Sequence, residues 1–135
     1  MPTDKMELRA LADRCEQATG ADREIDRALC PLVSIRVVDE GHPLGVCYYD
    51  KNRHGIPLPH FTYSIDAAIR LVPEGWLLAN LSQTDAGFWW AELRKGYITS
   101  YSAVAMTSHY RAATPALALT AACLRALAAQ EKGEG

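Results

Sequence analysis

The chain has 135 residues and a formal net charge of −2, with 49% hydrophobic and 22% charged residues. This composition excludes a disordered acidic chain, and the length fits one domain, since domains typically hold roughly 100–200 residues. The longest apolar-rich stretch, residues 112–129, is interrupted by polar side chains and falls short of the roughly 18 apolar residues that span a bilayer. The N-terminal residues lack the apolar core of a secretory signal. We therefore expect a cytoplasmic protein without membrane contact.

The first thirty residues predict a helical hairpin. Apolar side chains recur at helical spacing over residues 4–18, where Asp4 or Thr3 can serve as the N-cap. A second helix is expected over residues 22–30, since the proline that follows disfavours helical backbone at the residue before it. The hairpin would thus occupy residues 4–30.

The next part of the chain combines a strand, an irregular segment and a third helix. The β-branched residues of segment 32–38 predict a strand. Residues 39–60 contain three prolines and three glycines, which indicates an irregular insert with at most a short strand at residues 46–49. Ser64 is placed to cap a helix over residues 64–72.

Residues 75–106 predict an antiparallel meander. Its three strands are expected at residues 75–81, 88–94 and 97–106, because the segments between them are short and rich in turn-forming residues. In the middle strand, alternation places Trp89 with the apolar side chains of Ala91 and Leu93 on one face, and Trp90 on the other.

The last expected element is a helix over residues 114–130, with Thr114 as N-cap and Pro115 in the first turn. Together the elements predict the α+β class for residues 1–135. The expected architecture is a single-domain α/β/α sandwich, in which an antiparallel sheet of about 3–5 strands is flanked by about four helices.

Three segments of the chain resemble the phage ABA sandwich domain, a family of small proteins of bacteriophages and prophages. They are ATGADREID (18–26), PHFTYSIDAAIRLVPEGW (59–76) and AATPALALTAACLRALAA (112–129). The resemblance implies an antiparallel sheet between layers of helix and a phage or prophage context. It implies no catalytic residues. The insert 39–58 and the pair Trp89–Trp90 match no motif of the family, so an individual function is expected there.

The sequence predicts neither a metal site nor a bound cofactor. The four cysteines and four histidines lie far apart, whereas metal sites rest on short paired spacings. A cytosolic chain of this size does not need disulfide bonds. We expect the cysteines at positions 15, 30 and 123 to be small core residues on helix faces.

A catalytic alternative uses the cysteine of the insert. Cys47 lies near Asp50, His54 and His60 in the sequence, and a thiolate could be activated by such a base. This proximity along the chain does not place the sulfur within hydrogen-bond reach of either imidazole. A small thiol-dependent enzyme is therefore one of the alternative functions.

The preferred interpretation is a protein that acts without catalysis by binding a macromolecule. Its candidate contact residues mix cations and aromatic rings: Tyr48, Tyr49, Lys51, Arg53, His54 and Trp90. The balanced charge along the chain argues against direct nucleic-acid binding, which needs clustered Lys and Arg. The expected partner is a host or phage protein, including a nucleoprotein defence complex that the chain would inhibit in an anti-CRISPR-like way. A homo-oligomeric phage assembly component is the other alternative, built through a sheet edge or the Trp90 face.

Overall fold

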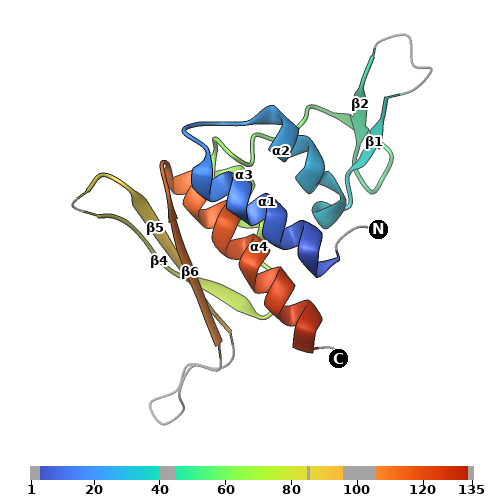
Figure 1. The fold of residues 1–135 in the computed structure, drawn as a ribbon. Helices are drawn as coiled ribbons and strands as arrows, with labels where there is room; N and C mark the ends of the chain where they lie inside the picture. Colours follow the sequence, from blue (N-terminus) through green and yellow to red (C-terminus); the bar gives the residue numbers. More distant parts are fainter. Residues whose placement is uncertain (1–3, 40–44, 85, 96–105, 134–135) are drawn as a thin grey trace.

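The structure is a computed structural model that describes residues 4–39, 45–84, 86–95 and 106–133 (Figure 1), and the side chains of all of these except 106–110 and 130–133. It shows a single-domain α+β fold, as predicted. The described residues form four α-helices and two three-stranded antiparallel sheets. None of these helices is both long and apolar enough to cross a membrane.

Helix α1 (Lys5–Gln17) begins at the predicted cap. The carboxylate of Asp4 accepts hydrogen bonds from the backbone N–H groups of Met6 at 2.8 Å and Glu7 at 3.1 Å, and this satisfies donors that the first helical turn leaves open. The helix buries Leu8, Ala12 and Cys15 on one face. Its neighbour in space is mainly the C-terminal helix.

Helix α2 (Arg23–Leu29) is capped by Asp22 and continues directly into a 3-10 helix, η1 (Cys30–Val33). The expected strand at 32–38 is therefore wrong in its first half, because Pro31 fits the first turn of a 3-10 helix, where its missing N–H has no partner to lose. Ser34 ends this helix with a left-handed φ of 62°.

The smaller sheet has the order β1-β2-β3 and consists of β1 (Arg36–Val38), β2 (Cys47–Tyr49) and β3 (Gly55–Ile56). Both neighbouring pairs are antiparallel. The short strand expected at 46–49 within the insert is present as β2. The second strand of the insert, β3, was not predicted, and it is formed by pairing with β2.

Helix α3 (Ile65–Ala68) begins at Ser64, whose hydroxyl accepts the N–H of Ala67 at 3.2 Å as predicted. It passes into a second 3-10 helix, η2 (Ile69–Leu71). The chain then turns into the next strand at Gly75, whose φ of +91° suits a residue without a side chain.

The larger sheet has the order β4-β5-β6, with β4 (Trp76–Gln83), β5 (Trp89–Lys95) and β6 (Met106–Ala112). The third strand of the meander is expected at 97–106, of which 97–105 lie outside the described residues. The described strand runs from Met106 to Ala112 and reads Met-Thr-Ser-His-Tyr-Arg-Ala, so residues 107–112 are a strand that the sequence did not predict. This segment has no regular alternation of apolar and polar residues.

The register of β4 shifts by one residue between Leu78 and Asn80. An extra residue at such a bulge moves the following side chains to the opposite face. Leu78 pairs with Leu93 and Leu81 pairs with Ala91, so both leucines lie on the inner face although they are three residues apart. As predicted, Ala91 and Leu93 are fully buried and Trp89 packs against the core.

Helix α4 (Pro115–Gly133) fills the centre of the molecule. The Thr114 hydroxyl caps it by accepting the N–H of Leu117 at 3.2 Å, as predicted. It packs against α1 on one side and against β5 and β6 on the other. Its contact with α1 includes an ion pair of Arg125 with Glu16 at 3.0 Å and with Asp13.

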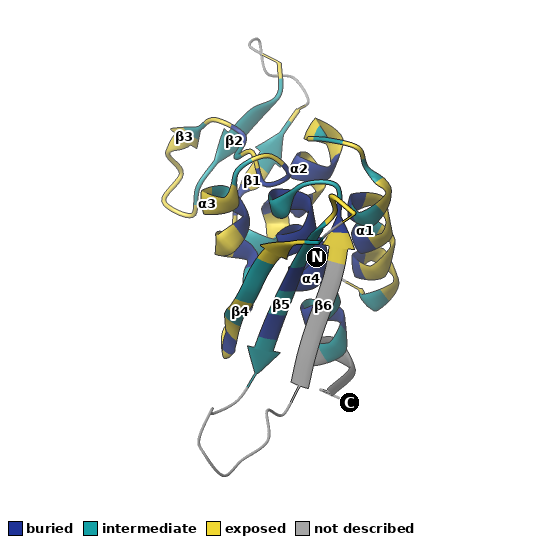
Figure 2. Cartoon of the chain, turned by 90° about the vertical axis from the view of Figure 1, so that its left-hand side faces the viewer, coloured by how far each residue is buried: buried dark blue, intermediate teal, exposed yellow. Residues whose placement is uncertain are grey.

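The two sheets lie on different sides of the helices (Figure 1). The larger sheet covers one side of α4, and the smaller sheet stands at one end of the molecule beside α2. Figure 2 shows the buried residues concentrated in the helices and the inner face of the larger sheet, whereas the strands of the smaller sheet are only partly buried. The smaller sheet is therefore peripheral to the main core.

Candidate functional site

The turn between β2 and β3 is held by the carboxylate of Asp50. One of its oxygens accepts the backbone N–H groups of Asn52 and His54, each at 2.9 Å. The main chain closes the turn, because the N–H of Asp50 donates to the carbonyl of His54 at 3.0 Å and the N–H of Arg53 donates to the carbonyl of Asp50 at 2.9 Å. These bonds lower the pKa of Asp50, the bond from His54 contributing most. The side chains of residues 51–54, which this backbone carries, are exposed.

Arg53 occupies a backbone conformation that normally suits glycine or asparagine. Its φ is 68°, in the left-handed region that costs an L-residue about 1–2 kcal/mol. The turn between β4 and β5 has the same closing bonds: the N–H of Gly87 donates to Thr84 and the N–H of Thr84 donates to the carbonyl of Phe88. There the left-handed position is Gly87, with a φ of +92°. The hairpin of the smaller sheet thus carries an arginine where its counterpart carries glycine.

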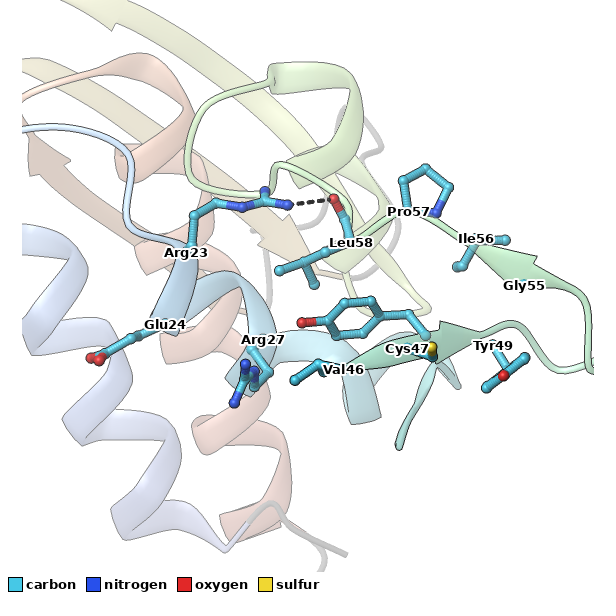
Figure 3. Close-up of a pocket in the computed structure, with 11 residues that line it drawn as sticks. Arg23, Glu24, Arg27, Val46, Cys47, Tyr49, Gly55, Ile56, Pro57 and Leu58 are labelled. Atoms are coloured by element: carbon cyan, nitrogen blue, oxygen red, sulfur yellow. Dashed lines mark hydrogen bonds between the residues drawn. The ribbon is translucent and has the colours of Figure 1, made fainter. Parts of the chain in front are cut away.

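A cleft of about 1110 Å³ separates α2 from the β2–β3 hairpin (Figure 3). Its helical wall carries Arg23, Glu24 and Arg27. The opposite wall is formed by Val46, the strands β2 and β3, and the segment that follows β3. Two arginines one helical turn apart therefore face a wall that includes Ile56, Pro57 and Leu58.

Arg23 ties the two walls together. Its guanidinium donates to the carbonyl of Leu58 at 3.0 Å, the bond drawn in Figure 3, and contacts the carbonyl of Pro59 at 3.3 Å. It also lies 2.8 Å from Nδ1 of His60, which must accept because a guanidinium has only donors. All of these partners belong to the chain itself, so Arg23 fixes the shape of the cleft.

The carboxylate of Asp26 anchors this arrangement in the interior. Asp26 is fully buried, and one of its oxygens pairs with Arg23 at 2.9 Å. The other accepts both the backbone N–H and the hydroxyl of Thr62, each at 2.8 Å. A buried carboxylate is tolerated when its oxygens are hydrogen-bonded in this way. Helix α2 is thereby locked to a segment 36 residues away.

Arg27 is the second cation of the cleft, and its side chain is exposed to solvent. Tyr48, which lines the same cleft, is the main cause of the raised pKa of Arg27. The carboxylates of Asp39 and Glu24 act on it through their charge. Arg27 takes part in none of the ion pairs within 4.0 Å that the described residues form.

Five of the six predicted contact residues come together on one hairpin. Tyr48 and Tyr49 belong to β2 and line the cleft, while Lys51, Arg53 and His54 form the exposed turn. Trp90 is separated from them, since it lies half-buried on β5 of the larger sheet. Sequence reasoning missed Arg23 and Arg27. Their spacing on one face of a helix that precedes the insert was the available signal, but nothing in the sequence showed that this face meets β2.

The catalytic alternative finds its residues dispersed. Cys47 lines the cleft, whereas neither His54 nor His60 is among the residues that line it. The Nδ1 atom of His54 lies 3.7 Å from the carboxylate of Asp50, and that of His60 accepts from Arg23. The side chains of the other three cysteines are buried, which raises the pKa of Cys15 to about 12 and that of Cys30 to about 11.

Comparisons of the chain with protein-family models, with curated proteins and with solved structures found no match. Within the part of the chain that the structure describes, no three His, Cys, Asp or Glu side chains gather as metal ligands.

Proposed function

We propose that this protein acts without catalysis, by binding a partner protein through the tip of the β2–β3 hairpin. The observation that carries the proposal is Arg53: a long cationic side chain at a strained and fully accessible position where glycine would serve the fold better. Backbone strain of this kind is typical of functional sites.

The tip has the properties of a preorganised contact surface. Asp50 fixes the backbone, so that little conformational entropy is lost when Lys51 and Arg53 meet a partner. The half-buried Tyr48 and Tyr49 stand at the base of the turn, and tyrosine and arginine are enriched among the residues that dominate interfaces. Cations on this turn favour an acidic protein surface, while three such groups are too few for strong phosphate binding at physiological salt.

The resemblance to the phage ABA sandwich domain supports a particular version of this proposal. In that version the partner is a host or phage protein, and the chain inhibits a host defence complex in the bacterial cytoplasm by occupying one of its surfaces.

The test is capture of partners from a bacterial lysate by the tagged full chain and by charge-reversal variants. The double variant Lys51→Glu/Arg53→Glu is expected to lose the proteins that the native chain retains, because like charges then oppose the acidic surface. Arg70→Glu is the matched control, since Arg70 is also exposed but lies on η2. Equal capture by all three proteins, or no captured protein under several buffer conditions, would refute the proposal.

A second candidate function, self-association, is supported by the outer face of the larger sheet. Leu77 is 53% exposed and Phe88 is 43% exposed, and the guanidinium of Arg111 lies 5.3 Å from the centre of the Phe88 ring. Exposed apolar side chains on one face can mark an interface between copies. Sedimentation of the native chain beside Leu77→Lys tests it: a native monomer at high concentration would exclude this role.

A further inference from the structure

The cleft beside the hairpin has a surface that differs from that of the tip, because it combines apolar side chains with a cation. Val46, Ile56 and Leu58 contribute aliphatic groups to its walls, and Arg27 stands on the helical wall. Figure 3 shows the Arg27 side chain next to Val46, away from the Arg23–Leu58 bond. The volume of about 1110 Å³ exceeds the range of roughly 300–1,000 Å³ that is usual for small-ligand pockets. Its size favours a chain segment over a small molecule.

The two arginines have different capacities for a ligand. Arg23 contacts Asp26, His60 and two backbone carbonyls, so both terminal nitrogens of its guanidinium already have partners within the chain. Arg27 takes part in none of the ion pairs that the described residues form. A guanidinium has five N–H donors in a planar fork, so Arg27 retains donors that match the two oxygens of a carboxylate.

The acidic groups around the cleft leave this position open. Glu24 lines the helical wall, but its carboxylate lies 3.4 Å from the guanidinium of Arg14. Asp39 acts on Arg27 through its charge without forming an ion pair among the described residues. Among the described residues no carboxylate pairs with the guanidinium of Arg27, which leaves its charge available to a ligand.

We propose that the cleft binds an extended segment of the partner protein, with an acidic side chain paired to Arg27 and a neighbouring apolar side chain against Val46, Ile56 and Leu58. This inference rests on the proposed function, since it specifies which part of the partner enters the site. Arg27 contacts the ligand, and Arg23 is a positioning residue that holds the opposite wall in place.

The test is a titration of the full chain, followed through its backbone amide resonances, with three tripeptide probes at millimolar concentration. The first is acetyl-Leu-Glu-Leu-amide. The second replaces glutamate with glutamine, and the third is acetyl-Leu-Gln-Leu with an unblocked C-terminal carboxylate. The glutamate probe is expected to shift the amides of residues 24–27, 46–49 and 55–58 and to bind about tenfold more tightly than its glutamine twin, as one charge-assisted pair allows.

Variants assign the effect to the cleft. Arg27→Gln should remove the preference for glutamate, while Arg27→Lys should retain part of it, because lysine keeps the charge but lacks the fork. Arg70→Gln, on η2 and not among the residues that line the cleft, should leave the preference unchanged. Equal binding of the first two probes, shifts confined to other residues, or tighter binding of the third probe than the first would each overturn the inference.

The two proposals fail in different ways. If the hairpin charge reversal abolishes partner capture but the glutamate probe does not bind the cleft, the inference about the cleft is wrong and the proposed function stands. If the probe binds as expected but capture is independent of the hairpin, the proposed function is wrong and the cleft remains a peptide site.

Discussion

The hairpin turns of the two sheets have the same backbone bonds but different residues at the decisive position. In the β4–β5 turn the left-handed residue is Gly87, and a Cβ there would meet nothing within 4 Å, so backbone conformation alone favours glycine. In the β2–β3 turn the same place is taken by Arg53. One turn therefore has the residue that its backbone favours, while the other holds a cationic side chain at a strained position.

The sheets that carry these turns also differ in what holds them. The larger sheet rests on α4 through fully buried side chains such as Leu93 and Ala91. The smaller sheet has strands of only two or three residues that are partly exposed. The segment after β3 is joined to α2 by two hydrogen bonds: Arg23 donates to the carbonyl of Leu58, and the carboxylate of Asp26 accepts the N–H of Thr62. Apolar packing dominates in one region and directional polar bonds in the other.

The largest expected effect comes from removing packing in the larger sheet. Leu93→Ala should lower the free energy of unfolding by about 2–5 kcal/mol, since it deletes buried methyl groups and leaves a cavity. Val37→Ala, in the half-buried β1, should cost about 1 kcal/mol or less, because its side chain is only partly removed from water. Urea unfolding followed by circular dichroism measures both. Equal losses would show that the smaller sheet belongs to the main core.

A loss of about 2–3 kcal/mol is expected for Asp26→Ala, because it leaves the buried N–H of Thr62 without its acceptor and the Thr62 hydroxyl with only the carbonyl of Asp22. The half-exposed Arg23 can return to water, which limits the cost. Asp26→Asn keeps one oxygen for Thr62 and should lose less. Amide hydrogen exchange should show faster opening around residues 58–62 in the alanine variant. Unchanged exchange there would mean that the polar bonds do not hold the segment.

The two turns can be compared directly by removing the side chain from one left-handed position and adding one at the other. Arg53→Gly should raise the free energy of unfolding by up to about 1 kcal/mol, because relief of strain exceeds the added entropy of the unfolded chain. The same variant should weaken partner capture. Gly87→Ala should destabilise the protein by about 1 kcal/mol, because it places a side chain at a left-handed φ and so introduces strain. Thermal unfolding of both variants checks the signs, and a destabilised Arg53→Gly protein would contradict the assignment of strain to Arg53.

The smallest effect is the response of the β2–β3 turn to acid. The pKa of Asp50 lies below its ordinary value of 3.8, because the N–H groups of His54 and Asn52 donate to the charged carboxylate. The turn therefore keeps its full stabilisation above pH 3.8 and loses it as the pH falls through the lower pKa of the folded state. The amide resonances of the two donors should report a midpoint below 3.8. In Asp50→Asn this transition should disappear.

Several features of the fold could be predicted because they depend on neighbours in the sequence. The caps at Asp4, Ser64 and Thr114 were recognisable, since each bonds to an N–H two or three residues away. The inner face of β5 followed from simple alternation. Residues 107–112, which form a strand that the sequence did not predict, show the limit of this reasoning. Pairing with β5, and not a strong pattern of its own, makes residues 106–112 a strand.

The sequence by itself determined the α+β class, the helix starts and the aromatic and cationic character of the hairpin, because short-range spacing and capping chemistry fix these properties. Only the tertiary structure decided that β1 pairs with β2, that Arg27 meets Tyr48 across a cleft, and that Trp90 lies apart from the hairpin. Those relations involve residues that are not neighbours in the sequence. They depend on how the helices and sheets pack as a whole, which no local pattern encodes.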